Sequence, residues 1–181
     1  MSVIINGNAG VTTNSGAVYD SLQRGTAVAS TSGTSIDFTG IPSWVKRVTV
    51  MFNGVSTNGS SEVQVQLGDS GGVETSGYNA TAGVVRGAYV GAAGAQTATS
   101  GFILEYNVTS TAAYLRSGHL VVTNISGNIW VASGVIGTST EGSICLSSGN
   151  KTTSAILDRI RITTVNGTDT FDAGSINILY E

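Results

Sequence analysis

The chain has 181 residues, a formal net charge of -3, and charged residues at only 10% of its positions. An ordinary soluble domain has about 25% charged residues; here 25 glycines and many Ser, Thr and Asn residues take their place. The eight Lys and Arg residues are spread along the chain, which argues against nucleic acid as a partner because no basic stripe forms. No apolar run reaches the length of about 18 residues that a membrane-spanning helix needs, so we expect no membrane insertion.

Residues 1–25 combine a short apolar start with Gly and Asn turns, and they lack the basic and apolar segments of a signal peptide. We expect them to form a connecting segment or N-terminal strands, ahead of a single domain over residues 26–181. A domain of this length buries roughly 70% of the surface that its unfolded chain exposes. Because Cys145 is the only cysteine, no disulfide forms within one chain, and packing and hydrogen bonds must hold the domain together.

Two alternating segments predict the centre of the fold. Apolar residues recur at every second position over 48–52 and again over 63–67, which is the period of a strand. Gln64 and Gln66 lie between the apolar residues of the second segment, so we expect a sheet with one buried face and one face in water. The connection, residues 53–61, contains Asn-Gly twice and favours a hairpin with a longer loop.

Residues 68–72 read GDSGG, the nucleophile motif of chymotrypsin-like serine proteases. That chemistry requires a histidine close to the serine, and in that family the histidine precedes the serine in the chain. Here the only histidine, His119, follows Ser70. We therefore interpret the motif as a turn, in which glycine adopts a positive φ and Asp69 and Ser70 hydrogen bond to the local backbone. We do not expect an enzyme.

Residues 74–101 are dominated by Gly, Ala and Ser, with strand-forming residues only near 84–86 and 88–90. Loops longer than about 12–15 residues are uncommon and often functional, so this segment is the candidate recognition surface. Amphipathic rings on exposed loops serve sugar and protein recognition. The alternative is a small-residue excursion that packs on the sheet. The candidate receptor-binding residues are Tyr78, Asn79, Arg86 and Tyr89.

Regular alternation resumes towards the C-terminus. Residues 119–125 and 129–132 flank a Ser-Gly-Asn turn and predict a second hairpin. Further strands are expected over 143–146, 155–164 and 176–180. No window shows the apolar period of an amphipathic helix. The sequence therefore predicts an all-β protein, an antiparallel β-sandwich of about eight to ten short strands whose length suits a jelly roll.

Two further groups of reactive side chains favour structural roles. Cys145 and His119 have the chemistry of a nucleophile and its base, but Cys145 lies between two apolar residues, where cysteine packs as a small buried side chain. Asn166, Asp169 and Asp172 offer oxygen ligands but lack the spacing of the twelve-residue calcium loop, so a plain turn is favoured. We expect neither a metal nor a cofactor.

Three longer segments carry a resemblance to a known family. They resemble the C-terminal domain found in many bacteriophage tail-fibre and minor tail proteins. The likeness covers most of the chain from about residue 26 to its end, except the Gly/Ala-rich middle, and it includes the GDSGG motif. The segments are SIDFTGIPSWVKRVTVMFNGVSTNGSSEVQVQLGDSGGVETSGY (35–78), RSGHLVVTNISGNIWVASG (116–134) and LDRIRITTVNGTDTFDAGSINILYE (157–181).

The resemblance implies a virion component at the distal end of a tail fibre, made in the bacterial host cytoplasm and typically a homotrimer joined to the fibre shaft. Such a domain contacts a glycan or a protein on the host cell surface. We therefore expect a receptor-binding domain without catalysis, with a saccharide as the favoured receptor. The alternatives are a purely structural fibre or baseplate module, and a glycan-degrading tail enzyme. The enzyme would need paired carboxylates, whereas the acids here are few and scattered.

Overall fold

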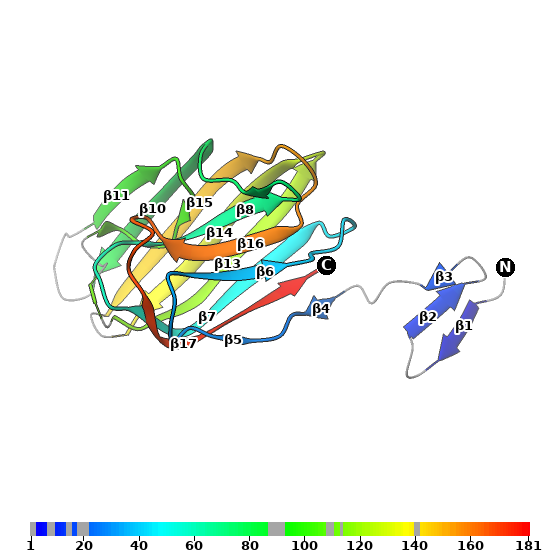
Figure 1. Ribbon diagram of the computed structural model, residues 1–181, viewed down its shortest axis with the longest axis horizontal. Helices are drawn as coiled ribbons and strands as arrows, with labels where there is room; N and C mark the ends of the chain where they lie inside the picture. Colours follow the sequence, from blue (N-terminus) through cyan, green and yellow to red (C-terminus); the bar gives the residue numbers. More distant parts are fainter. Residues whose placement is uncertain are drawn as a thin grey trace.

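The computed structural model describes residues 3–6, 10–13, 16–17, 22–86, 93–107, 111–112, 114–139 and 142–181. Every regular element in these residues is a β-strand, which confirms the predicted all-β class. Two antiparallel sheets stack as a sandwich and do not close into a barrel (Figure 1). The described part of the chain contains no helix long and apolar enough to cross a membrane.

The large sheet has nine strands, in the order β11-β10-β15-β14-β13-β7-β17-β4 with β5 also paired to β17. Its strands are β4 (Gln23–Arg24), β5 (Val28–Ala29), β7 (Arg47–Thr57), β10 (Tyr78–Arg86), β11 (Ala93–Ala98), β13 (Arg116–Ser126), β14 (Ile129–Thr138), β15 (Ser143–Thr152) and β17 (Phe171–Tyr180). The small sheet has five strands, in the order β12-β8-β16-β6 with β9 also paired to β8. Its strands are β6 (Ser35–Thr39), β8 (Val63–Asp69), β9 (Gly72–Val73), β12 (Phe102–Ile103) and β16 (Arg159–Thr164).

Eight strands pair in a nested order: β7 with β17, β8 with β16, β10 with β15, and β13 with β14. A jelly roll has the same nested pairing, in which a long ribbon of paired strands folds over on itself, but it divides its eight strands equally between two sheets. Only β8 and β16 lie in the small sheet, whereas the other six strands are contiguous in the large one. The pair β13–β14 is the predicted second hairpin, and its turn contains Gly127 at a φ of 51°.

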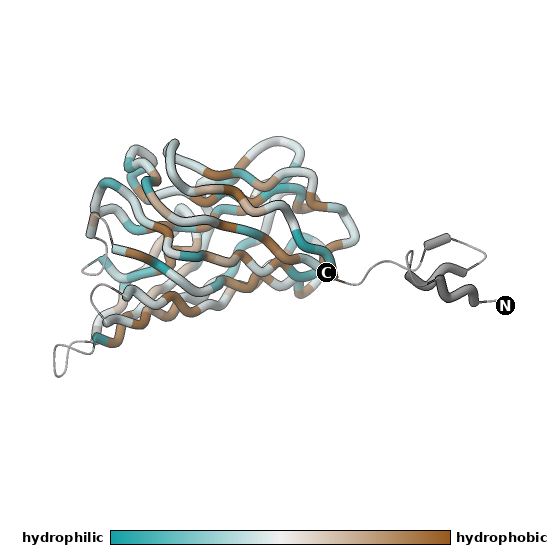
Figure 2. The backbone as a smooth tube through the Cα atoms, turned by 90° about the horizontal axis from the view of Figure 1, so that it is seen from below, coloured by the Kyte–Doolittle hydropathy of each residue, from teal (hydrophilic) through white to brown (hydrophobic). Residues whose placement is uncertain are grey.

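The core lies between the two sheets, where their apolar rows meet. Val48 and Val50 of β7, Val65 of β8 and Ile160 of β16 are fully buried. Burying a side chain of this size stabilises the fold by roughly 1.5–3 kcal/mol relative to leaving it in water. Apolar and polar residues alternate along the long strands of the sandwich, as the colouring of Figure 2 shows, so these strands direct their apolar row towards this core.

Strands β7 and β8 do not form the predicted hairpin. Strand β7 pairs with β13 and β17, whereas β8 pairs with β9, β12 and β16, so residues 58–62 cross from one sheet to the other. Strands β7 and β8 each have one apolar row. When the two sheets stack, these rows are buried against each other, whereas a hairpin would place both rows on the same face of one sheet. The prediction that the polar row of β8 faces water is also wrong, because Gln64 and Gln66 are only 2% and 4% exposed.

The described residues between 74 and 101 include two paired strands in place of the expected long loop. Strands β10 and β11 pair with each other at the edge of the large sheet, and β10 also pairs with β15 over its whole length. The alternation was hidden because its inward residues include Ala80 and Ala82, which are small but buried. The segment therefore extends the edge of the large sheet, which is neither a long loop nor an excursion packed on the sheet.

The N-terminal strands pair in two groups. Strands β1 (Val3–Asn6), β2 (Gly10–Thr13) and β3 (Gly16–Ala17) form a sheet of their own. Strand β4 pairs with β17 instead, so Gln23 and Arg24, which we assigned to a connecting segment or to N-terminal strands, form a strand at the edge of the sandwich. That the preceding residues join the domain to a fibre shaft stays a prediction.

Candidate functional site

The residues predicted to bind a receptor do not share a surface. Tyr78 is 3% exposed, so its placement on an exposed loop is wrong. Asn79 is its neighbour on β10 and is exposed on the opposite face of the sheet, because successive strand residues point to opposite sides. Arg86 is half-buried at the end of β10. Tyr89 lies outside the described residues.

Tyr78 is a core residue whose polar end is held by the backbone. Its hydroxyl accepts a hydrogen bond from the Leu67 amide at 2.6 Å and donates to the Glu74 carbonyl at 3.0 Å. Its ring packs edge-on against Phe102, with the ring centroids 5.1 Å apart. Burial raises the pKa of the Tyr78 hydroxyl far above its ordinary value. These contacts leave the side chain no part in surface recognition.

The GDSGG segment is the predicted turn. Asp69 and Gly72 are paired residues of β8 and β9, and the Gly71 amide donates to Asp69 Oδ1 at 2.7 Å. Gly72 has a φ of 130°, a conformation that favours glycine. Ser70 lies at the exposed tip of this turn, in the small sheet, whereas His119 lies on the outer face of the large sheet. The motif therefore provides a structural corner.

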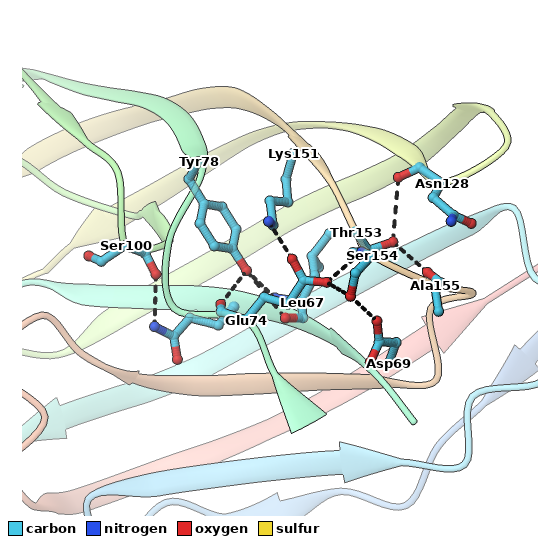
Figure 3. A network of polar contacts seen from close by, with 11 residues as sticks. Leu67, Asp69, Glu74, Tyr78, Ser100, Asn128, Lys151, Thr153, Ser154 and Ala155 are labelled. Atoms are coloured by element: carbon cyan, nitrogen blue, oxygen red, sulfur yellow. Dashed lines mark hydrogen bonds and ion pairs between the residues drawn. The ribbon is translucent and has the colours of Figure 1, made fainter. Parts of the chain in front are cut away.

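A polar network around this corner joins the two sheets (Figure 3). Ser154 Oγ is 2.6 Å from Asp69 Oδ2, and the Ser154 amide donates to Glu74 Oε1 at 2.6 Å. Glu74 also forms an ion pair with Lys151, whose ammonium group lies 5.3 Å from the centroid of the Tyr78 ring. Hydrogen bonds from Ser154 and the Gly71 amide lower the pKa of Asp69. The polar groups of this network are satisfied by protein partners.

The other reactive groups are also structural. Cys145 is buried in the core, whereas His119 is exposed on the opposite side of the same sheet. Asn166 Oδ1 accepts hydrogen bonds from the backbone amides of Thr168 and Asp169, which is the predicted turn. Asp172 accepts a hydrogen bond from Ser56. Among the described residues, no three His, Cys, Asp or Glu side chains are grouped closely enough to hold a metal ion.

A polar groove of about 310 Å³ lies on the outer face of the small sheet, and it is the candidate site. Adjacent strands place its side chains in two rows. The first row is Gln66 and Arg161, with Asp37 next to Arg161 but outside the lining, and the second row is Gln64, Thr163 and Ser35. Paired residues on neighbouring strands lie about 4.8 Å apart in the sheet. The turn after β16 and residues near Thr75 and Ser100 complete the groove, for which we use the name polar groove below.

The two glutamines of the polar groove are held in fixed positions. Gln66 Nε2 donates to the Ser100 carbonyl at 2.8 Å, and Gln64 Oε1 accepts from Ser100 Oγ at 2.9 Å. A side chain at Gly101 would clash, because a Cβ there would lie 2.6 Å from Gln64 Oε1. The glycine therefore lets this segment close over β8. Within the described part of the chain, Gln66 Oε1 has no hydrogen-bond partner, and it is the acceptor that stays available to a ligand.

The charge of the polar groove is neutralised within the protein. Arg161 forms two hydrogen bonds of 2.7 Å with the two carboxylate oxygens of Asp37. The hydrogen bond that Arg161 donates to Asp37 raises the pKa of Arg161, so the guanidinium stays charged. The lining residues include no Asp or Glu. The groove therefore offers amide, hydroxyl and backbone groups, and its one cation already has a counter-ion.

The sequence contains a signal for this site that alternation alone did not reveal. The polar residues of QVQ at 64–66 and of RIRIT at 159–163 occupy the non-core positions of two strands. Only the pairing of β8 with β16 brings these rows together, and they are far apart in the chain.

Comparisons with protein-family models, with curated proteins and with solved structures found no match to this chain.

Proposed function

We propose that this chain is the receptor-binding domain of a bacteriophage tail fibre, and that it binds a saccharide of the host cell surface without catalysing a reaction. The resemblance of three long sequence segments supports the phage context. The polar groove supports the saccharide. The observation that carries the proposal is the pair of buried glutamines, of which Gln66 has an acceptor that no described residue pairs with, in a groove whose lining contains no carboxylate.

A saccharide matches the chemistry of this groove. Sugar hydroxyl groups donate and accept hydrogen bonds, and the groove presents both kinds of partner on side chains that are already ordered. Ordered partners lose less conformational entropy on binding, which favours affinity. A glycosidase requires two carboxylates that flank the scissile bond. The lining of the groove supplies none, so a binding role is favoured over hydrolysis.

The test is binding to an array of bacterial surface saccharides. We expect the wild-type chain to bind at least one saccharide, and Gln66→Met to weaken that binding by about tenfold, the equivalent of one lost hydrogen bond. Methionine keeps the length of the side chain. The matched control is Gln23→Met, a half-buried glutamine on β4 of the other sheet. No saccharide binding by the wild type, or equal binding by the Gln66 variant, would contradict the proposal.

A purely structural fibre or baseplate module is the second candidate. The outer face of the large sheet favours this function, because the apolar side chains of Val85, Ile144 and Leu146 are each more than half exposed there. The two functions differ in a competition experiment. A receptor-binding domain blocks adsorption of its phage to host cells when added in excess, whereas a structural module does not.

A further inference from the structure

A second hollow, of about 270 Å³, lies along the side of the sandwich where the small sheet and the large sheet both end. Strand β6 forms one wall of it, and in Figure 1 this strand runs along the same side of the sandwich as β5 and β17. Among the described strands β6 pairs only with β16, so its other backbone edge has no strand partner there. Residues 25, 26 and 28 and the end of β17 form the opposite wall. We use the name edge cleft for this hollow.

Close backbone packing builds the opposite wall of the edge cleft. The Gly25 amide donates to the Ile178 carbonyl oxygen at 2.8 Å, and a Cβ at Gly25 would lie 2.9 Å from Cγ1 of Ile178. A larger residue at this position would therefore push its segment away from β17. Ile178 and Phe38 are only 4% and 8% exposed, and they give the edge cleft an apolar floor.

The edge cleft offers a contact that the polar groove lacks. No aromatic side chain is among the described residues that line the polar groove, whereas Phe38 and Tyr180 line the edge cleft. The Tyr180 ring packs against the core, and its centroid lies 6.1 Å from that of Trp44, so its neighbours hold it in place. Thr26 and Thr39 are exposed in the same lining. An aromatic ring with polar groups around it suits a sugar ring, which has an apolar C–H face and hydroxyl groups at its edge.

The polar groove and the edge cleft meet at one ion pair. Arg161 lines the polar groove, Asp37 lines the edge cleft, and two hydrogen bonds of 2.7 Å join their side chains. The two residues are paired on the adjacent strands β16 and β6, which lie about 4.8 Å apart. Both side chains are more than one third exposed, so the pair lies at the surface between the two hollows. A chain molecule can therefore extend from one hollow into the other over this pair.

We infer that the polar groove and the edge cleft are two subsites for one oligosaccharide. The hydroxyl groups of one sugar unit bind in the polar groove, and the apolar face of another unit packs on the Tyr180 ring. This inference rests on the saccharide-binding function proposed above. A single sugar occupies only one subsite. In an oligosaccharide the second contact forms within a complex that already exists, so it adds affinity at a lower entropic cost.

The experiment measures affinity against the length of the saccharide by titration calorimetry. The probe is a size-fractionated ladder of fragments, from one sugar unit upwards, prepared from the array saccharide that the wild-type chain binds most tightly. We expect affinity to rise by about five- to tenfold once a fragment is long enough to reach the ring, which is the gain expected of one aromatic contact. Still longer fragments should gain little more.

The variant Tyr180→Leu removes the flat ring but keeps an apolar side chain against the core. It should bind the shortest fragments like the wild type and should lose the five- to tenfold gain of the longer ones. Tyr180→Phe keeps the ring and should retain the gain. The matched control is Tyr106→Leu, since Tyr106 also packs on the core but lines neither hollow. Circular dichroism checks that each variant is folded.

The outcomes separate this inference from the proposed function. Gln66→Met should weaken the binding of fragments of every length, because it acts in the polar groove. If short fragments bind in this Gln66-dependent way but affinity does not rise with length, the inference is overturned and the proposed function stands. It is also overturned if folded Tyr180→Leu keeps the gain, or if Tyr106→Leu loses it to the same extent. A wild-type chain that binds no fragment overturns both.

Discussion

The network around Asp69 and the polar groove are two polar regions that differ in how their hydrogen-bonding groups are used. In the network, Tyr78, Glu74, Lys151 and Ser154 satisfy one another and the backbone. In the polar groove, the side-chain nitrogen of Gln66 donates to the protein, whereas its side-chain oxygen has no partner among the described residues. A satisfied buried network stabilises one conformation, whereas an ordered acceptor without a protein partner can accept a hydrogen bond from a ligand. The difference separates a structural corner from a candidate binding site.

The largest expected effect that tests this contrast is on Tyr78. Tyr78→Ala removes a buried ring and should lower the free energy of unfolding by about 3–5 kcal/mol. Tyr78→Phe removes only the hydroxyl and leaves the buried Leu67 amide without its acceptor, at a cost of about 1–3 kcal/mol. Urea unfolding measures both. Saccharide binding by the folded Phe variant should equal that of the wild type, and selective loss of binding would contradict the structural role.

We expect the next largest effect on the free energy of unfolding for Glu74→Gln. It leaves the ammonium group of Lys151, whose side chain is 7% exposed, without its counter-ion. Breaking a fully buried ion pair costs 3–5 kcal/mol. Because the Glu74 side chain is 20% exposed, we expect a smaller loss of about 2–3 kcal/mol. The double variant Glu74→Gln, Lys151→Met should recover part of that loss. If the single variant unfolds like the wild type, the ion pair does not stabilise the corner.

Stability should also fall in acid because of this network. Ser154 and Gly71 lower the pKa of Asp69; for Glu74, burial opposes ionisation, but Lys151 and Ser154 lower its pKa overall. A carboxylate whose pKa is lower in the folded chain than in the unfolded chain stabilises the fold while it is ionised. For Asp69 and Glu74 this stabilisation is complete above their ordinary pKa values of 3.8 and 4.5, and it is lost as the pH falls through their lowered folded values. Unfolding free energies measured between about pH 7 and pH 2 should show this decline.

The control for the acid experiment is Ser154→Ala, which removes the hydroxyl that Asp69 and Glu74 share. Its stability should be lower at neutral pH, by about 1 kcal/mol for a lost hydrogen bond, and should change less between neutral and acid pH. A variant that keeps the full acid dependence of the wild type would show that the decline arises from other carboxylates.

The sequence predicted the fold class and most strands because alternation is local. The row of Val48, Val50 and Phe52 and the turn at Gly127 need no knowledge of distant residues. Pairing is not local, so the same alternation led to a hairpin between β7 and β8 that the stacking of two sheets replaces. The strand β10 was missed because buried alanines give a weak signal.

The candidate site could not be predicted for the same reason. Gln66 and Arg161 are neighbours only because β8 pairs with β16, nearly a hundred residues further along the chain. The residues that chemistry singled out, Tyr78 and Ser70, have conspicuous types but ordinary structural roles. Reading the polar row of β8 as solvent-facing also hid the fact that Ser100 holds it in place.

Asp37→Asn should have the smallest effect on stability, and it is the most direct test of saccharide binding in the polar groove. Asp37 and Arg161 are 37% and 36% exposed, so losing their ion pair should cost less than about 1 kcal/mol. If the groove binds saccharides, as proposed, the change leaves the Arg161 guanidinium without its counter-ion at the edge of the site. Arginine pairs with carboxylates through two parallel hydrogen bonds, so the variant should gain binding to acidic saccharides on the array while the wild type prefers neutral ones. The control Asp158→Asn removes a similarly exposed partner of Arg159, outside the lining of the groove. Equal preferences in the wild type and in Asp37→Asn would show that the saccharide does not approach Arg161, and a loss well above 1 kcal/mol would show that this pair belongs with the structural network instead.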